Sequence, residues 1–261
     1  MSRYLGIDIG TFESKGVLVD GEGRVLAEAK RPHRMLVPEP GWAEHRARED
    51  WWGDFCAIAR ELIAASGVAA EDIRAVGASG IGPCMLPVDA AGEPLMNAVL
   101  YGVDTRASRE VRELTERFGE ARLLERCGTG LSSQSVGPKI LWLRRNRPEL
   151  FARTVRVMTS TTYLVERLTG AFVIDHYSAA SFGPLYDVGE RAWSAELAEG
   201  IVDLAMLPPP VWTTEIAGRV TARAAAETGL AEGTPVIAGT IDAAAEAISV
   251  GVRAPGDVML M

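Results

Sequence analysis

Two acidic residues near opposite ends of the sequence lie in contexts that suit phosphate chemistry. The first is Asp8, in the run Asp8-Ile-Gly-Thr11 between two β-prone segments. Gly10 allows a tight turn whose amide can approach an anion, while Thr11 and Lys15 add a hydroxyl and a cation. A carboxylate at the end of a buried strand suits a water-mediated Mg²⁺ contact. The alternative is an ordinary Asp–Gly hairpin turn, because the pattern is short.

The second acidic residue is Asp242, which lies between a short apolar run and an Ala-rich segment. As a helix N-cap, an aspartate would stabilise the helix by about 1 kcal/mol. As a general base at the mouth of a cleft, it would orient a hydroxyl and take its proton late in a loose phosphoryl-transfer transition state. A helix N-terminus favours the ionised form that a base needs, so the two interpretations are compatible. Because the proton leaves late, a carboxylate with little elevation of its pKa would suffice as the base.

Two further segments could contact a ligand. In Leu100-Tyr-Gly-Val-Asp-Thr-Arg106, the side chains of Asp104 and Arg106 offer an acceptor and a fork of donors that suit sugar hydroxyls. Taken alone, they could equally be a helix cap and a surface arginine. Residues 77–84 form a Gly-rich exit from an expected strand, which lets a ligand approach the backbone or serves only as a bend.

The composition is that of a globular protein with an acidic balance. The 261 residues include 27 Lys and Arg against 35 Asp and Glu, for a net charge of −8. Without a Lys/Arg cluster, such a chain is poorly suited to nucleic acid or an anionic membrane. The 3 Cys and 3 His are scattered, which argues against a disulfide framework and a zinc site. No run approaches the ~20 apolar residues of a membrane span, so we expect a cytoplasmic protein.

The spacing of apolar residues predicts the elements that position these groups. Three strands joined by tight turns are expected over 4–9, 15–19 and 25–29, with further strands over 73–78, 85–88, 155–158 and 236–238. Helices are expected from residue 51 for roughly five turns and over 105–118, 136–146, 162–168 and 242–250. The initial meander differs from the strand–helix–strand start of a Rossmann unit, so the pattern predicts an α/β domain on a mixed sheet.

Taken in order, these segments resemble the FGGY family of carbohydrate kinases, in the superfamily that includes hexokinase, actin and the Hsp70 ATPase. The resemblance implies an α/β, ribonuclease H-like (actin-like ATPase) domain with a mixed five-stranded sheet flanked by helices. It extends over nearly the whole chain. The matching stretches are Gly6-Ile-Asp-Ile-Gly-Thr11 with Lys15, Pro40-Gly-Trp-Ala-Glu44 before Trp51-Trp52, and residues 73–80, 98–106 and 238–252.

The resemblance also implies a role for each candidate residue. Asp242 is similar to the base that deprotonates the sugar hydroxyl. Asp8 is similar to the acid that holds Mg²⁺ through water, while the nucleotide phosphates are expected on the residues that follow it in the turn, Gly10, Thr11 and Lys15. The sugar pocket is expected to include Asp104 and the turn at Ile81 and Gly82, and by extension Arg106 and Trp42.

Two departures from the family pattern affect these expectations. Residues Ile81-Gly-Pro-Cys84 replace the Gln-Met-His-Gly of many ketopentose kinases, so the pocket is expected to be more apolar and its sugar is left open. Family members are also longer and have two actin-like domains. We therefore expect residues 1–250 to form the sugar-binding domain and residues 251–261 to be a stub of the nucleotide-binding domain, beginning with a turn at 255–256 and a strand over 257–261.

The function implied is an ATP-dependent carbohydrate kinase that transfers the γ-phosphoryl of MgATP to a hydroxyl of a small sugar, ketose or polyol. We expect this chain alone to be nearly inactive, because half of the nucleotide site is absent. One alternative is a sugar-binding or pseudokinase domain with a sensing or interaction role. Another is an Hsp70- or actin-like ATPase that acts on no sugar. Exposure of the face that normally meets the second domain would favour self-association, so a homodimer is also considered.

Overall fold

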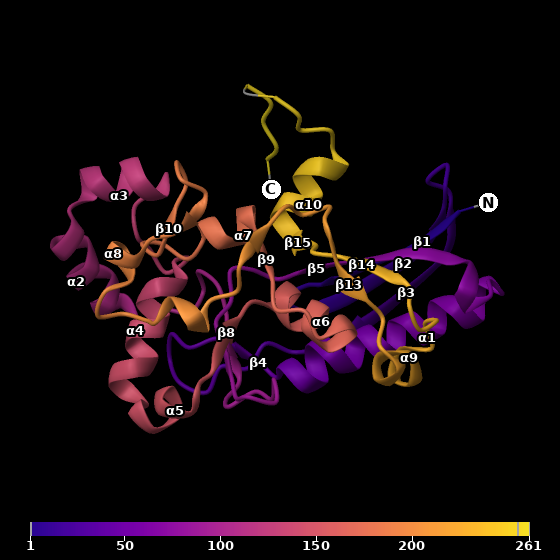
Figure 1. Ribbon diagram of the computed structural model, residues 1–261, viewed down its shortest axis with the longest axis horizontal. Helices are drawn as coiled ribbons and strands as arrows, with labels where there is room; N and C mark the ends of the chain where they lie inside the picture. The colour runs from indigo at the N-terminus through magenta and orange to yellow at the C-terminus, as the bar shows by residue number, and fades with distance from the viewer. Residues whose placement is uncertain (1, 255, 261) are drawn as a thin grey trace.

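A central seven-stranded mixed sheet organises the computed structural model, which describes residues 2–254 and 256–260 (Figure 1). The strand order is β13-β14-β5-β1-β2-β3, and β15 also pairs with β5. The first three strands are antiparallel, whereas β1, β5 and β14 are parallel. The strands of this sheet are β1 (Arg3–Ile9), β2 (Glu13–Asp20), β3 (Val25–Pro32), β5 (Ile73–Gly80), β13 (Ile216–Arg219), β14 (Pro235–Ile237) and β15 (Thr240–Ile241).

The mixed α/β sheet is therefore confirmed, but the expected count of five strands is wrong. The added strands lie at one side of the sheet, where β13 pairs with β14 and β15 extends the contact with β5. The predicted strands at 85–88 and 155–158 form instead a small antiparallel pair outside the sheet. The described residues contain four two-stranded pairs, of which three are antiparallel: β4 (Glu44–His45) with β7 (Ala98–Val99), β6 (Leu86–Val88) with β8 (Arg156–Met158), and β10 (Tyr186–Asp187) with β11 (Ala192–Trp193). The fourth, β9 (Ile174–Asp175) with β12 (Pro210–Val211), is parallel.

One face of the sheet is covered by helices. Along β1 the alternating residues Leu5, Ile7 and Ile9 are buried on this face, as period-two alternation requires. A π-helical segment (Ala47–Gly53) leads into α1 (Asp54–Ser66), which packs on β1–β3. Only the two together cover the helix predicted from residue 51, because α1 itself has 13 residues. Helices α6 (Ser160–Thr169) and α9 (Ala222–Thr228) extend this layer, with α6 against β5 and β14 and α9 against α1 (Figure 1).

A second, mostly helical lobe lies beside the sheet (Figure 1). Its hydrophobic core is separate from that of the sheet and includes Leu114, Ile140, Leu143 and Phe182. The predicted helices over 105–118 and 136–146 both lie here. The helices of this lobe are α2 (Ser108–Phe118), α3 (Glu120–Cys127), α4 (Val136–Asn146), α5 (Pro148–Arg153), α7 (His176–Ala180) and α8 (Ala195–Ala198).

The chain returns from the lobe to the sheet and ends beyond α10 (Asp242–Ser249). In the described residues after this helix, 250–254 and 256–260, there is no further helix or strand. The expected strand at 257–261 is therefore wrong for 257–260, while residues 255 and 261 lie outside the described residues. The assignment of 251–261 to a second domain stays a prediction. Among the helices of the described ranges, none is both long and apolar enough to cross a membrane.

Candidate functional site

The turn between β1 and β2 is a compact loop closed by its own backbone. The Gly10 N–H donates to the carbonyl of Glu13 at 3.2 Å. A Cβ at Gly10 would lie 2.7 Å from that carbonyl oxygen, so only glycine fits without a shift. The Thr11 hydroxyl lies 3.2 Å from the Tyr101 hydroxyl, and the exposed Lys15 ammonium is 3.9 Å from a Glu13 carboxylate oxygen. Thr11 and Lys15 thus present a hydroxyl and a cation at this turn.

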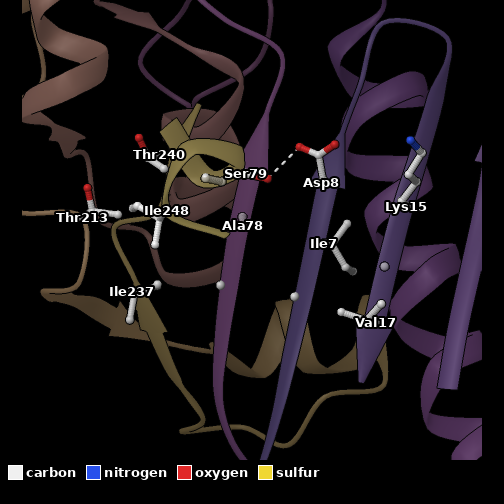
Figure 2. Close-up of a pocket in the computed structure, with 15 residues that line it drawn as sticks. Ile7, Asp8, Lys15, Val17, Ala78, Ser79, Thr213, Ile237, Thr240 and Ile248 are labelled. Carbon is white, nitrogen blue, oxygen red and sulfur yellow. Dashed lines mark hydrogen bonds between the residues drawn. The ribbon is translucent and has the colours of Figure 1, made fainter. Parts of the chain in front are cut away.

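Asp8 is held at the carboxyl end of β1 by a neighbour that the sequence did not reveal. The Ser79 hydroxyl donates to Asp8 Oδ1 at 2.6 Å, because parallel pairing of β1 with β5 sets these two residues side by side (Figure 2). Among the described residues, no donor reaches Asp8 Oδ2. One carboxylate oxygen is therefore fixed in orientation, and the other is left for an external partner.

Asp242 is the first residue of α10 rather than its N-cap, a position that Ile241 takes without a side-chain hydrogen bond. The Ala243 N–H donates to Asp242 Oδ1 at 2.8 Å. Burial raises the pKa of Asp242 to about 6, and the negative charges of Asp8 and Glu246 act in the same direction. Burial therefore outweighs the effect of the helix N-terminus, and the pKa is raised further than the proposed role of a base requires. The carboxyl remains mostly ionised at pH 7.

The register of three strands brings the two acidic segments together. Asp8 on β1 lies opposite Ser79 on β5, and Thr240 on β15 lies on the other side of Ser79. The chain reaches Thr240 through Gly239, whose φ is +70° and where a Cβ would lie 2.1 Å from the Ala78 carbonyl oxygen. Asp242 follows two residues after Thr240. Residues near the two ends of the chain thus meet at one edge of the sheet.

Two cavities flank this edge. The first, of about 480 Å³, has Asp8, Lys15, Ser79 and Thr240 in its wall, while its remaining lining is largely apolar (Figure 2). The second, of about 590 Å³, is rich in hydroxyl and amide groups. Its polar lining consists of Thr129, Ser132, Gln134, Ser135, Tyr177 and Ser181. Thr240 and Ala245 line the first cavity, whereas Ile241 and Ala243 line the second. The segment that carries Asp242 therefore borders both.

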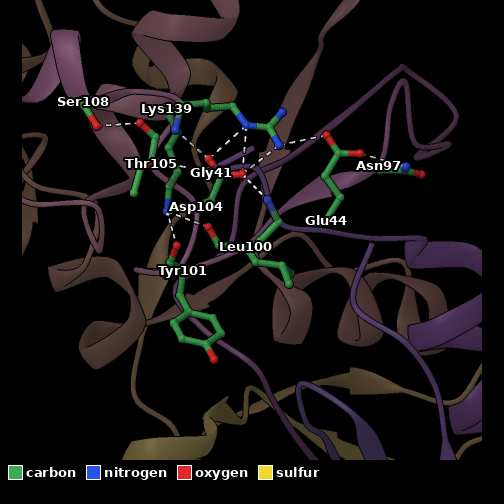
Figure 3. A network of polar contacts seen from close by, with 11 residues as sticks. Gly41, Glu44, Asn97, Leu100, Tyr101, Asp104, Thr105, Ser108 and Lys139 are labelled. Carbon is green, nitrogen blue, oxygen red and sulfur yellow. Dashed lines mark hydrogen bonds and ion pairs between the residues drawn. The ribbon is translucent and has the colours of Figure 1, made fainter. Parts of the chain in front are cut away.

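Asp104 and Arg106 lie in a buried ionic network and line neither cavity. Figure 3 shows Asp104 and Glu44 in this network. The side chains of Asp104 and Arg106 are both 0% exposed, and Arg106 donates to Asp104 at 2.8 Å and to Glu44 at 2.8 Å. Asp104 also accepts the Ala43 N–H at 2.7 Å, while the guanidinium lies 3.9 Å from the centre of the Trp42 ring. The network fixes the segments at 41–44 and 98–106. Sugar contact by Asp104, Arg106 and Trp42 stays a prediction.

In the Gly-rich turn after β5, one residue lies in the hydrophobic core and the next two line the second cavity. Ile81 is 1% exposed, belongs to the core of the sheet and lines neither cavity, so its contact with a sugar stays a prediction. Gly82 and Pro83, joined by a cis peptide bond, line the second cavity. A Cβ at Gly82 would lie 2.3 Å from Ile241 Cγ2, so glycine lets this turn lie against the strand before Asp242.

Lys139 on α4 is a buried cation that sequence reasoning missed. Its ammonium donates to the carbonyls of Leu100 at 2.7 Å and Tyr101 at 3.3 Å (Figure 3). Burial lowers the pKa of Lys139 to about 8, against the raising effect of Cys84 and Asp104. Lys139 thus fixes the backbone beside Tyr101, whose hydroxyl contacts Thr11 in the turn after β1.

Replacing Lys139 with methionine is expected to destabilise the fold. Two buried carbonyls would lose their donor, at a cost of about 1–3 kcal/mol in the free energy of unfolding. Urea unfolding followed by circular dichroism at pH 7 measures the change. Lys30, which is exposed on β3, gives a matched control, because Lys30→Met should leave the free energy of unfolding nearly unchanged. Equal stabilities of the two variants would contradict the supporting role of Lys139.

The donor set around Asp8 also bears on metal binding. Within the described ranges, no group of three or more His, Cys, Asp or Glu side chains is arranged to hold a metal ion. A carboxylate with one unengaged oxygen suits a hydrated, hard cation that keeps most of its waters, as Mg²⁺ does. The residues present therefore fit a cation that is shared with a phosphate ligand and fit poorly to a metal held by the protein alone.

Comparisons with known proteins identify the family of the chain. Residues 3–249 match the N-terminal domain of the FGGY family of carbohydrate kinases. A xylulose kinase from Bacillus subtilis is 31% identical over 260 residues, covering 99% of this chain and 51% of that protein. A glycerol kinase from Nocardia farcinica is 33% identical over 229 residues, covering 85% and 45%. The crystal structure of xylulose kinase from Rhodospirillum rubrum matches with a TM-score of 0.92 and 33% identity, covering 98% of this chain and 52% of that one.

The sheet order and these likenesses define the fold as that of the actin-like ATPase kinases, which confirms the expected fold class. The chain belongs to the FGGY family of carbohydrate kinases. It spans about half the length of the curated relatives that it matches.

Proposed function

We propose that the protein is an ATP-dependent carbohydrate kinase in which this chain supplies the acceptor pocket, the general base and part of the phosphate site. The main support is the position of the segment that carries Asp242, because it borders both cavities. The first cavity contains Asp8 and Lys15, and the second contains the hydroxyl and amide groups. A kinase needs this arrangement, because a phosphate donor and an alcohol acceptor must meet at one base.

The groups of the turn after β1 and those in the wall of the first cavity have separate tasks in this proposal. Thr11, Lys15 and the backbone of the turn at Gly10 would bind the nucleotide phosphates, and Asp8 would hold Mg²⁺ through water. When bound, Mg²⁺ supplies positive charge that offsets the charge of the phosphate oxygens. Ser79 keeps the Asp8 carboxylate in one orientation by donating to Oδ1.

Asp242 would orient the acceptor hydroxyl and accept its proton. Transfer through a loose transition state depends mainly on positioning and charge, and the proton leaves late. A carboxylate with a pKa of about 6 is ionised at neutral pH and is a stronger base than an ordinary aspartate. Exclusion of water on domain closure would suppress transfer to water in place of the sugar.

The second cavity suits a small molecule with several hydroxyl groups. Its polar lining comes from the α3–α4 connection and α7, whereas Gly82 and Pro83 supply an apolar edge. Relatives of similar identity carry the names xylulose kinase and glycerol kinase. Xylulose is a ketose and glycerol is a polyol. We therefore propose a small ketose or polyol as acceptor, with Gln134 among the groups that recognise it.

We further propose that residues 251–261 begin a second actin-like domain that completes the nucleotide site. This proposal rests on the family, whose curated members this chain covers over about half their length. The 261-residue chain alone is then expected to produce ADP at less than about 1% of the rate of the complete two-domain protein, since most of the binding energy used for catalysis is lost.

A coupled assay of ADP formation with xylulose, ribulose, glycerol and other small polyols tests both statements. One acceptor should stimulate ADP formation by the complete protein well above its rate without acceptor. The absence of stimulation by every acceptor would contradict the proposed kinase, and an ATPase independent of sugar would favour the actin- or Hsp70-like alternative. A high rate from the 261-residue chain alone would contradict the need for a second domain.

A further inference from the structure

Two histidines contact the turn that joins β1 and β2. His33 follows β3 and His45 lies in β4, and both are buried, with the side chain of His33 4% exposed and His45 0% exposed. Their rings pack edge to face, with centroids 4.9 Å apart. They come from separate segments of the chain and converge on the same short loop, which neither the motif nor the charge pattern of the sequence indicated.

Each histidine contacts a successive carbonyl of the loop. His33 Nε2 lies 3.0 Å from the Gly10 carbonyl oxygen, and His45 Nε2 lies 3.0 Å from the Thr11 carbonyl oxygen. A carbonyl oxygen only accepts hydrogen bonds, so both Nε2 atoms must carry a proton and donate. Two hydrogen bonds from the histidines to adjacent carbonyls therefore fix the backbone of the loop.

The second ring nitrogens show that the two histidines differ in charge. His33 Nδ1 lies 2.9 Å from Asp54 Oδ2, which also accepts the Ser14 hydroxyl at 2.7 Å. Both nitrogens of His33 thus face acceptors, and only the imidazolium form satisfies both. His45 Nδ1 accepts the Trp51 indole N–H at 3.1 Å, so His45 must be neutral with its proton on Nε2.

The surrounding charges favour the same assignment. Burial by itself would lower the pKa of His33, but the hydrogen bond and negative charge of Asp54, with the Gly10 carbonyl and Asp50, raise it above its ordinary value. Burial and the positive charge of His33 lower the pKa of His45 to about 4, despite Asp50. One imidazolium and one neutral ring can therefore lie in contact without repelling each other.

Because the peptide bond is planar, the direction of the Gly10 and Thr11 carbonyls also fixes the direction of the N–H groups that follow them. In a trans peptide, the carbonyl and the N–H of the next residue point in opposite directions. In the described residues, the cis bonds are only those before Pro83 and Pro184. With the Gly10 and Thr11 carbonyls directed at the histidines, the N–H groups of Thr11 and Phe12 point away from them. Over residues 2–254 and 256–260, neither N–H donates to a protein acceptor.

We propose that His33 and His45 are positioning residues that aim the N–H groups of Thr11 and Phe12 at the phosphate chain of a nucleotide. This inference rests on the proposed function, in which the loop binds phosphate. Unpaired backbone N–H groups directed to one side of a loop form a site for an anion. The histidines touch neither phosphate nor sugar and act only through the backbone that they hold.

The first test reads the protonation states directly and needs no ligand. The chain has 3 His, so nitrogen-15 spectra of the imidazole rings can be assigned with single substitutions, His176→Gln among them. At pH 7, His33 should be protonated on both nitrogens, and His45 should be protonated on Nε2 alone and remain so to about pH 5. A neutral His33 at pH 7, or a His45 proton on Nδ1, would overturn the inference.

The second test uses the different demands on the two rings. Glutamine has one donor end and one acceptor end, as neutral histidine has, so His45→Gln can keep both hydrogen bonds. His33 needs two donors, so His33→Gln leaves an oxygen facing either Asp54 or the Gly10 carbonyl. Calorimetric titration with magnesium tripolyphosphate should give a Kd within about threefold of the unsubstituted chain for His45→Gln, and a Kd about tenfold weaker for His33→Gln and His45→Met.

The outcomes separate this inference from the proposed function. Equal affinity for tripolyphosphate in all variants would overturn the role of the histidines and leave the phosphate-binding loop in place. Absence of tripolyphosphate binding by the unsubstituted chain would overturn phosphate binding by this loop and, with it, the role of the histidines. Thermal melts show whether each variant is folded, and if His45→Met is not, the contrast between His45→Gln and His33→Gln still decides the question.

Discussion

Replacing Asp242 with asparagine is expected to lower the kcat of sugar phosphorylation by roughly 10²–10⁴-fold, the usual contribution of a general base. The amide keeps the size and the hydrogen bond to the Ala243 N–H but cannot accept the proton. The unsubstituted enzyme should lose activity as the pH falls through about 6, because protonation of Asp242 removes the base. Initial rates of ADP formation from pH 5 to 8 in the complete protein measure both effects.

The same substitution should stabilise the fold, which separates loss of catalysis from loss of structure. The pKa of Asp242 is raised in the folded chain, so the folded state binds more protons between about pH 4 and 6, and stability falls as the pH rises through that window. Above pH 6, Asp242→Asn should be more stable by on the order of 1 kcal/mol, a value discounted for partial exposure. Unchanged turnover in the variant would contradict the catalytic role and favour a non-catalytic sugar-binding domain.

Replacing Asp8 with asparagine is expected to lower kcat/KM for MgATP by about a hundredfold or more, since a carboxylate that holds Mg²⁺ supplies charge that an amide lacks. The affinity for the sugar should change little, because Asp8 lines the first cavity and not the second. Steady-state kinetics with each substrate varied in turn measure this difference.

Ser79 provides the matched control for Asp8. Ser79→Ala removes one hydrogen bond to Asp8 Oδ1 but keeps the charge, so the loss in kcat/KM for MgATP should be about tenfold or less. If Asp8→Asn and Ser79→Ala had equal effects, the charge of Asp8 would not matter and the magnesium role would be contradicted.

The sequence predicted the sheet well where its pattern was long and regular. The alternation of Leu5, Ile7 and Ile9 and the apolar stripe of α1 are strong local signals, and both elements formed as expected. Strand β13 was missed because none of its 4 residues is buried, so it contains no apolar run, and β15 was missed because it has only 2 residues. Their place is set by pairing with β14 and β5, which is a property of the fold and not of the local sequence.

The site was predictable where its residues follow a strand in a recognisable pattern. Asp8 and Asp242 both stand where a strand gives way to a turn or helix, and the structure brings their segments to one edge of the sheet. Ser79 and Tyr101 were missed, since their partners Asp8 and Thr11 are 71 and 90 residues away in the sequence. A lone serine or tyrosine carries no local signal of such a contact.

For Asp104 and Arg106, the residue types suggested a ligand site where the structure has a buried ion pair. Their residue types suggest an open site for hydroxyl groups, yet both side chains are 0% exposed and paired within the chain. The charge of Arg106 is met by Glu44, which lies 62 residues earlier, and its guanidinium faces the ring of Trp42. Burial of an ion pair depends on such distant partners, so the sequence alone could not distinguish a ligand site from a structural network.

The most direct test of this account is a carbon-13 titration of the Asp242 carboxyl in the 261-residue chain and in its Asp8→Asn variant. We expect a pKa of about 6 for Asp242 in the unsubstituted chain. In the variant this pKa should fall, because one nearby negative charge is removed, but burial should keep it above 3.8, the ordinary value. A pKa for Asp242 that is ordinary from the outset, or one that does not respond to the loss of Asp8, would show that the two carboxylates do not share a crevice.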